Sequence, residues 1–309
     1  MNMFVFILRR LFQTIPVMIG VTLAVFLMMH LIPGDAAKIM AGENANPDQI
    51  EQMRENLGLN DPLHIQYLRF VTNAVQGDLG NSIRTSRPVT EEIFSSRFAI
   101  TVQLALIGTA AAVLLGLVAG IISATRKYSA ADVGIMLVAL LGLSLPNFWL
   151  GIMLIYLFSV NLGWLPVAGW GTWEHMILPA ITLGTGGAAI IARMTRSSML
   201  EVLNQDFIRT AYAKGVSDKV VIYKHALRNA LIPVVTVVGL QFGGLLGGAV
   251  ITETVFAING LGRLIIDSIR AHDFPMVQGT ILVCAVLFVL VNFLVDITYR
   301  LINKRIDLN

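Results

Sequence analysis

Hydrophobic segments of about the length of a bilayer crossing recur along the chain, separated by shorter polar stretches. A helix that crosses the roughly 30 Å hydrocarbon core of a membrane needs about 20 residues. The segments that meet or approach this length are Leu11–Ile32, Ile100–Thr125, Val133–Val160, Met176–Met194, Leu231–Ala257 and Val277–Tyr299. The pattern predicts an all-α integral membrane protein with six transmembrane helices.

The fourth segment gives the weakest signal, because it is short and contains Pro179 and several glycines. Five crossings are therefore an alternative. The distribution of Lys and Arg favours six: with the N-terminus inside, most of these residues fall on the cytoplasmic side, and most of the external ones lie in one long loop, where they influence orientation little. Both termini are then predicted to face the cytoplasm.

Composition supports the membrane assignment. In this chain of 309 residues, 56% are hydrophobic, more than a water-facing surface tolerates. A cleaved signal made of Arg9, Arg10 and the first apolar segment is disfavoured, since no small-x-small cleavage site follows. The single cysteine, Cys284, forms no disulfide within the chain and is expected to be a packing residue.

Two polar regions are long enough to function outside the lipid. The first, residues 33–98, is predicted to be external and contains helix-like stretches at Asp48–Leu57 and Leu63–Val75. The second, residues 199–231, is predicted to be cytoplasmic. With no internal repeat, the economical prediction is a single transmembrane domain over residues 1–309 with these two elaborations.

The cytoplasmic insert has the periodicity of two short helices. Apolar residues at spacings of three and four predict that one face of the first helix carries Leu200, Leu203, Phe207 and Ala211. Gly215 is placed to cap its end, and Ser217 is a candidate N-cap for the next helix. Val220, Tyr223, Leu227 and Leu231 form a second periodic set, which predicts another helix running toward the membrane.

These helices have two possible uses. Small Ala211, Ala213 and Gly215 would allow a partner protein to approach closely, while Arg209 and Lys214 would provide charged contacts that set its orientation. Alternatively, the insert is an amphipathic segment that rests on the anionic inner leaflet. Composition does not choose between the two.

Several classes of activity are disfavoured by missing motifs. No lysine is followed by serine or threonine, so the chain has no phosphate-binding loop of the Gly-x4-Gly-Lys-Ser/Thr type. The sequence also contains no His-Glu-x-x-His and no Gly-x-Ser-x-Gly, and its five histidines are scattered. We therefore expect no catalytic, metal or cofactor site on this chain, and an energy source in a partner or a gradient.

The fifth and sixth apolar segments carry further candidates. Gly239, Gly243 and Gly247 form a stripe suited to close helix contact, either at a subunit interface or within the chain. Glu253 lines a pathway, contacts a docking protein or lies at the external interface. Asp296 shares a helix face with Asn292 and is either part of a proton relay or, as we favour, a structural pairing or capping group.

Several motifs together resemble the first permease of the dipeptide, oligopeptide and nickel branch of ATP-binding-cassette importers, over nearly the whole chain. In the predicted external parts these are Leu31-Ile32-Pro33-Gly34-Asp35, Leu57-Gly58-Leu59-Asn60-Asp61-Pro62-Leu63, Gly77-Asp78-Leu79-Gly80-Asn81-Ser82, Gly260-Leu261-Gly262-Arg263 and Asp273-Phe274-Pro275. In the predicted cytoplasmic part, Arg193–Leu203 is similar to the same permeases, and Arg209–Gly215 and His225–Pro233 resemble their coupling loop.

Three features depart from the general pattern. Ala36 stands where proline is common, Arg209-Thr210-Ala211 replaces Glu-Ala-Ala, and the interval from Gly215 to Pro233 is long. The last two are familiar in the peptide branch of the family.

The resemblance implies a type I importer permease fold in a bacterial inner membrane, paired with a second similar permease. Two partner ATPases would use ATP and Mg²⁺, and an extracytoplasmic binding protein would deliver the substrate. The ATPase-coupling residues would be Phe207, Arg209, Thr210, Ala211, Lys214 and Gly215. The residues that contact the binding protein would be Pro33, Gly34, Asp35, Gly260 and Gly262.

Substrate identity is not implied. Dipeptides, oligopeptides, glutathione-like tripeptides and nickel or other metal chelates all remain possible, because fold-level similarity does not determine the ligand. The main rival class is a gradient-driven secondary transporter, and a scaffold membrane protein is a more distant one.

Overall fold

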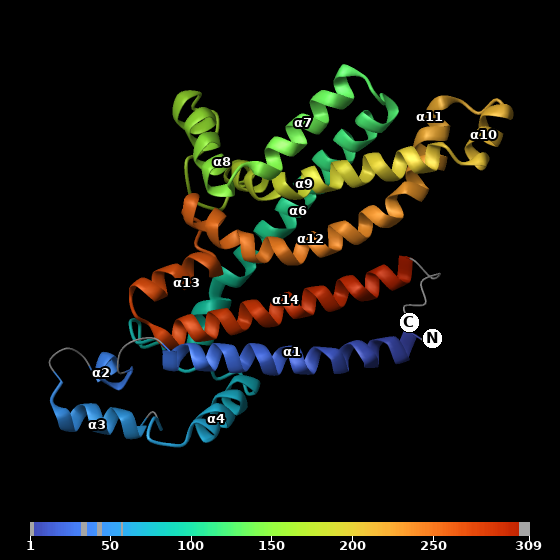
Figure 1. The fold of residues 1–309 in the computed structure, drawn as a ribbon. Helices are drawn as coiled ribbons and strands as arrows, with labels where there is room; N and C mark the ends of the chain where they lie inside the picture. The colour runs from blue at the N-terminus through green and yellow to red at the C-terminus, as the bar shows by residue number, and fades with distance from the viewer. Residues whose placement is uncertain (1–2, 32–35, 42–44, 57, 303–309) are drawn as a thin grey trace. The chain divides into compact units, whose positions relative to one another are not determined.

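The computed structural model describes residues 3–31, 36–41, 45–56 and 58–302. Nearly all of these residues that have regular structure are helical (Figure 1). Within the described ranges, the only β pairing is an isolated bridge between Asn81 and Pro88. The predicted all-α class is confirmed.

The chain divides into two compact units. Unit 1 comprises residues 1–100 and 260–289, and unit 2 comprises residues 101–259 and 290–309. The helices that begin in unit 1 are α1 (Met3–Leu31), α2 (Ala36–Ala41), α3 (Pro47–Asn56), α4 (Leu63–Val75), α5 (Val89–Glu92), the π-helical turn η1 (Ile93–Arg97), α6 (Phe98–Thr125), α13 (Leu261–Arg270) and α14 (Phe274–Ile302). Two of these, α6 and α14, continue into unit 2.

The other helices lie wholly in unit 2. They are α7 (Ala130–Ser144), α8 (Asn147–Leu154), the π-helical turn η2 (Ile155–Asn161), α9 (Trp173–Leu203), α10 (Asp206–Ala213), α11 (Asp218–Val220), the π-helical turn η3 (Val221–Ala226) and α12 (Leu227–Val255).

Five helical spans in the described part of the chain are long and apolar enough to cross a membrane. They are Val5–Met28, Val89–Thr125, Trp173–Leu203, Asp218–Leu245 and Phe274–Thr298. A sixth crossing is possible only if Ala130–Ser144 and Asn147–Asn161 count together, and these two pieces meet at an angle of 109°. The doubt about the fourth segment was therefore misplaced, since α9 is a continuous helix of 31 residues. The third segment is the broken one.

The break in the third segment follows from Pro146. A residue before proline is pushed out of the α region, and Leu145 is extended, with φ −77° and ψ 130°. The α7 helix ends there with the Leu145 N–H bonded to the carbonyl of Leu141. Pro146 then begins a new direction as the residue before α8. Because apolar periodicity is the same on both sides of the proline, hydropathy alone does not show this bend.

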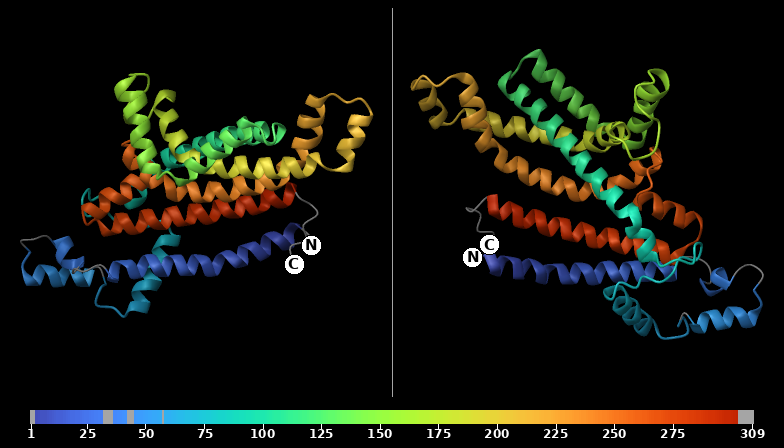
Figure 2. Two further views of the ribbon diagram at one scale, coloured as in Figure 1. Left: turned by 45° about the horizontal axis from the view of Figure 1, so that its top comes forward. Right: turned by 180° about the vertical axis from the view of Figure 1, so that it is seen from behind.

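Small residues allow the helices of unit 2 to approach closely. A Cβ placed on Gly116 would lie 2.7 Å from the carbonyl oxygen of Ala188, and one on Gly120 would lie 2.7 Å from that of Ala192. These glycines bring α6 against the backbone of α9. The α9 helix also packs along α12, and the two run side by side in every view (Figure 1, Figure 2). The core of this unit therefore has α9 at its centre, as expected for membrane helices packed through small residues.

Unit 1 contains the two helices predicted in the first polar region, now seen as α3 and α4. The α4 helix is held to α1 by polar and aromatic contacts: the hydroxyl oxygens of Thr22 and Tyr67 are 2.8 Å apart, and the Phe26 and Tyr67 rings meet edge to face at 5.5 Å. The prediction of helices in this region is confirmed.

The close packing of α6 on α9 predicts that two neighbouring glycines respond oppositely to substitution. In Gly184→Ala the new methyl would lie 2.7 Å from the backbone oxygen of Gly108, whereas in Gly186→Ala it would meet open space. We expect Gly184→Ala to lose about 1–3 kcal/mol of stability through overpacking. Gly186→Ala should lose none, because alanine is the better helix former by about 1 kcal/mol. Thermal unfolding midpoints of the purified protein in detergent measure this, and equal midpoints would contradict the packing described.

Candidate functional site

The predicted cytoplasmic insert forms a compact helical projection at one end of the paired helices α9 and α12 (Figure 1, Figure 2). It consists of α10, α11 and η3, and η3 runs directly into α12. Long helices of 31 and 29 residues therefore enter and leave it. Any displacement of the projection acts directly on these two helices.

The first helix of the insert is shorter than predicted. The expected face from Leu200 to Ala211 is divided, because α9 ends at Leu203 and α10 begins only at Asp206. The side-chain amide of Asn204 donates to the carbonyl of Leu200 at 2.9 Å, which satisfies a carbonyl at the helix end. As a result Phe207 is 40% exposed, whereas Ile208 and Ala211 are buried, so the prediction that Phe207 shares one helix face with Ala211 was wrong.

Gly215 caps α10 as predicted. Its φ is +76°, a value that favours glycine. Its N–H donates to the carbonyl of Tyr212 at 2.9 Å, and the N–H of Val216 donates to that of Ala211 at 3.2 Å. This pair of bonds is a Schellman motif. Since a Cβ on Gly215 would meet nothing within 4 Å, the constraint at this position is the backbone angle and not space.

The second helix of the insert begins where predicted but presents a different face. Ser217 occupies the N-cap position without a side-chain capping bond. Val220 and Tyr223 of the periodic set are 40% and 59% exposed, whereas Val221, Ala226 and Ala230 are buried. The reason is η3, because a π-helical turn bonds residues five apart and so rotates the following helix relative to an α-helical pattern.

A small apolar core holds the projection together. It contains Ala124 from the end of α6 and residues from α9, α10, η3 and α12, namely Met199, Val202, Ile208, Ala211, Val221, Ala226 and Ala230. Ala211 is therefore buried in the chain's own core. It is not available for close approach by a partner, which corrects the expectation drawn from its small size.

The outer surface of the projection combines aromatic and charged groups. Phe207 and Tyr212 are exposed on α10. Arg209 forms an i,i+3 ion pair with Asp206 at 3.4 Å, with both side chains largely in solvent. Thr210 donates to the carbonyl of Asp206, and Lys214 is exposed. Aromatic and basic groups on a rigid support suit a protein interface, where such residues are enriched.

Sequence reasoning missed a buried ion pair close to this projection. Arg196 of α9 donates to both carboxylate oxygens of Asp132 of α7, through Nε and Nη2, each at 2.7 Å. Asp132 is 3% exposed. The only local signal was Ser129, whose side chain accepts from the Asp132 N–H as the N-cap of α7. The partner is 64 positions away in the chain, a separation that no local pattern reveals.

The glycine stripe of α12 is not uniform. A Cβ on Gly239 would collide with Cγ1 of Val295, so this glycine packs against α14 within unit 2. Gly243 is buried, whereas Gly247 is exposed, and a Cβ there would meet nothing within 4 Å. Glu253 on the same helix is fully buried, and its carboxylate accepts from the hydroxyl of Thr101 at 2.6 Å. The Thr101 bond shows that a group within this chain satisfies the Glu253 carboxylate.

The predicted external contact residues lie in unit 1. Gly260 is the N-cap residue of α13, and Gly262 is buried in its first turn. Near them, Asp273 accepts from the Ser82 hydroxyl at 2.5 Å and from the Ile83 N–H at 3.1 Å, which ties the 82–87 loop to the start of α14. Pro33, Gly34 and Asp35 fall outside the described residues.

Comparisons with known proteins identify the class. Residues 116–308 match the family described as binding-protein-dependent transport system inner membrane component, and residues 3–105 match the corresponding N-terminal family. The chain belongs to this family of transport permeases. It is therefore a multi-pass inner membrane protein, and it is a permease component of an ATP-binding-cassette transporter complex rather than a catalytic subunit.

Relatives align along almost the full chain. The glutathione transport system permease protein GsiC of Escherichia coli O6:H1 is 48% identical over 97% of this chain and 98% of its own length. The dipeptide transport system permease protein DppB of Alkalihalophilus pseudofirmus is 46% identical over 98% of this chain and 99% of its own.

Among solved structures, the inward-facing MetNI methionine ABC transporter resembles this chain with a TM-score of 0.58 and 21% identity. The match covers 68% of this chain and 96% of that one. This likeness supports the type I importer permease fold.

Proposed function

We propose that this chain is one of two permease subunits of an ATP-driven importer of short peptides, either dipeptides, oligopeptides or tripeptides such as glutathione. Full-length relatives that carry glutathione and dipeptide permease names support this substrate class over nickel or other metal chelates. The single observation on which the mechanism rests is the rigid projection α10–η3 and its continuity with α9 and α12.

In this proposal the projection receives force from an ATPase. Phe207, Arg209, Thr210, Lys214 and Tyr212 form the contact surface, because their side chains are exposed on one short helix. Ala211 and Gly215 support that surface and are not part of it. Ala211 fills the core, and Gly215 sets the turn that fixes α10 against η3. Closure of the partner ATPases displaces the projection, and α9 and α12 move with it.

The complete transporter would contain a second similar permease, two ATPases that use ATP and Mg²⁺, and an extracytoplasmic binding protein. Gly247, as the exposed member of the α12 stripe, is the best placed of the three glycines for contact with the second permease. Residues 33–35 and the turn at Gly260 and Gly262 would contact the binding protein. This chain would supply half of the translocation pathway.

The proposal predicts that transport activity depends on the assembled complex. A tagged chain, expressed with its chromosomal partners, should copurify with two ATPases and a second permease. In proteoliposomes that also contain binding protein, the complex should accumulate radiolabelled dipeptide or glutathione only when ATP is supplied. Uptake of either solute by this chain alone, driven by an ion gradient, would instead establish the secondary transporter.

The Schellman turn predicts a selective defect in Gly215→Val. A β-branched residue at φ +76° is strained by about 1–2 kcal/mol or more, so the elbow between α10 and α11 should change its angle. We expect membrane insertion to remain intact while ATP-dependent uptake falls at least about tenfold.

Gly77→Val is the matched control, because Gly77 has φ +82° and equally open surroundings but lies in unit 1, after α4. It introduces the same kind of strain away from the proposed coupling surface. Equal loss of uptake in the two variants would remove the special role of the Gly215 turn.

The proposed orientation places the α6–α7 turn and both termini in the cytoplasm and α4 outside. In a Cys284→Ala background, the Val75→Cys variant should react with a membrane-impermeant maleimide in intact spheroplasts. The Tyr128→Cys variant should react only after lysis. Both native side chains are highly exposed, at 83% and 80%, so access within the fold is matched. The reverse labelling pattern would invert the topology.

A further inference from the structure

A fully bonded carboxylate joins three helices of unit 2 beside the projection. Asp132 of α7 accepts from Arg196 of α9 through both of its oxygens, from the hydroxyl of Ser123 on α6, and from the backbone N–H of Tyr128 at 2.9 Å. Each carboxylate oxygen thus has two donors. We refer to Ser123, Asp132 and Arg196 as the three-helix cluster.

The position of this cluster connects α7 to the projection. Arg196 lies about two turns before the end of α9 at Leu203. Ser123 is adjacent to Ala124, which is part of the apolar core under α10 and η3. Helices α6 and α9 are thus built into that core, whereas the buried residues assigned to it include none from α7. Together with the short turn that follows Thr125, the cluster attaches the start of α7 to this assembly.

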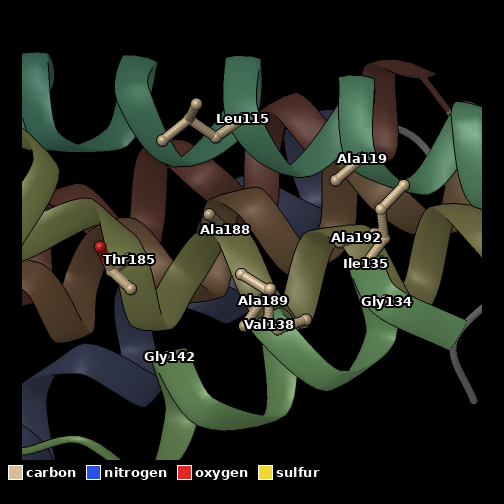
Figure 3. A pocket seen from close by; sticks show the side chains of 11 residues that line it. Leu115, Ala119, Gly134, Ile135, Val138, Gly142, Thr185, Ala188, Ala189 and Ala192 are labelled. Carbon is tan, nitrogen blue, oxygen red and sulfur yellow. The ribbon is translucent and has the colours of Figure 1, made fainter. Parts of the chain in front are cut away.

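Apolar packing next to the cluster is sparse. About one turn further along each helix, Ala119, Ile135 and Ala192 line a cavity of about 430 Å³ between α6, α7 and α9 (Figure 3). Its other walls are mostly small residues, including Gly134, Ala188 and Ala189. The cavity removes apolar contact between α7 and the other two helices at this level, so the Asp132–Arg196 pair carries more of the attachment of α7 here.

We propose that Asp132 and Arg196 are positioning residues that make α7 follow the end of α9 when the projection is displaced. This inference rests on the proposed coupling function. A guanidinium fork with two parallel bonds fixes direction as well as distance, which a lysine at the same place would not do. Through α7 the motion reaches the 109° bend and α8, which lies toward the opposite end of α9 from α10 (Figure 1).

Uptake per ATP hydrolysed is the measurement that separates positioning from simple structural support. The main variant combines Asp132→Asn with Arg196→Gln, because removing both charges avoids leaving one charge buried without a partner. In the full complex, with binding protein and dipeptide or glutathione, we expect ATPase copurification and ATP hydrolysis to persist. Solute transported per ATP should fall about twofold to thirtyfold.

Two further variants serve as an intermediate case and a control for this measurement. Arg196→Lys keeps the charge and loses the fork, so it should give an intermediate ratio and remains informative if the double variant fails to assemble. Arg193→Gln removes an exposed cation from the same helix and should leave the ratio unchanged. A normal ratio in the double variant, or uptake and hydrolysis that fall together in proportion to assembled complex, would overturn the proposal.

A spin-label distance tests the motion directly. In a Cys284→Ala background, labels on cysteines that replace Leu137 of α7 and Glu201 of α9, both exposed, should keep the same separation with and without nucleotide when the cluster is intact. In the double variant the distance distribution should become nucleotide-dependent. A nucleotide-dependent distance with the cluster intact would refute rigid attachment. Failure of the coupling function itself would be recognised separately, because the native complex would then bind no ATPase.

Discussion

The fold depends on keeping backbone hydrogen bonds within the chain, because hydrocarbon supplies no partner for an exposed N–H or C=O. Helices satisfy this requirement in every span, and the π-helical turns η1, η2 and η3 satisfy it while changing the register of side chains. The apolar surroundings also explain the close approach of α6 to α9. With lipid as apolar as leucine, helices gain little from burying large side chains and associate instead through glycine and alanine.

The projection shows how a water-exposed element is built on such a frame. It has a conventional apolar core, capped helices and an exposed charged surface, and it continues without a loop into α12. Rigidity comes from the Schellman turn at Gly215 and from burial of Ala211 and Val221. In the proposed coupling role, a flexible docking element would absorb displacement, whereas a rigid one would pass it on.

Local patterns predicted the parts of the fold that local chemistry decides. The apolar segments, the helices α3 and α4, and the glycine cap of α10 all follow from length, periodicity and backbone freedom. The failures arose where the helical pattern is interrupted. The α9 helix ends at Leu203, Pro146 bends the third segment, and η3 changes the helical register, so the periodic set at Val220 and Tyr223 is exposed. The pair of Asp132 and Arg196 was invisible because it depends on which helices pack together.

The bend between α7 and α8 has a consequence for what surrounds it. A helix that ends inside an apolar layer leaves its last carbonyl groups without intrahelical partners. Acyl chains have no donors for these carbonyl groups. The region around Leu145 and Pro146 must therefore lie beside protein, ordered water or lipid headgroups. The bend therefore requires polar groups of protein, water or lipid headgroups beside it, even though its own side chains are almost entirely hydrophobic.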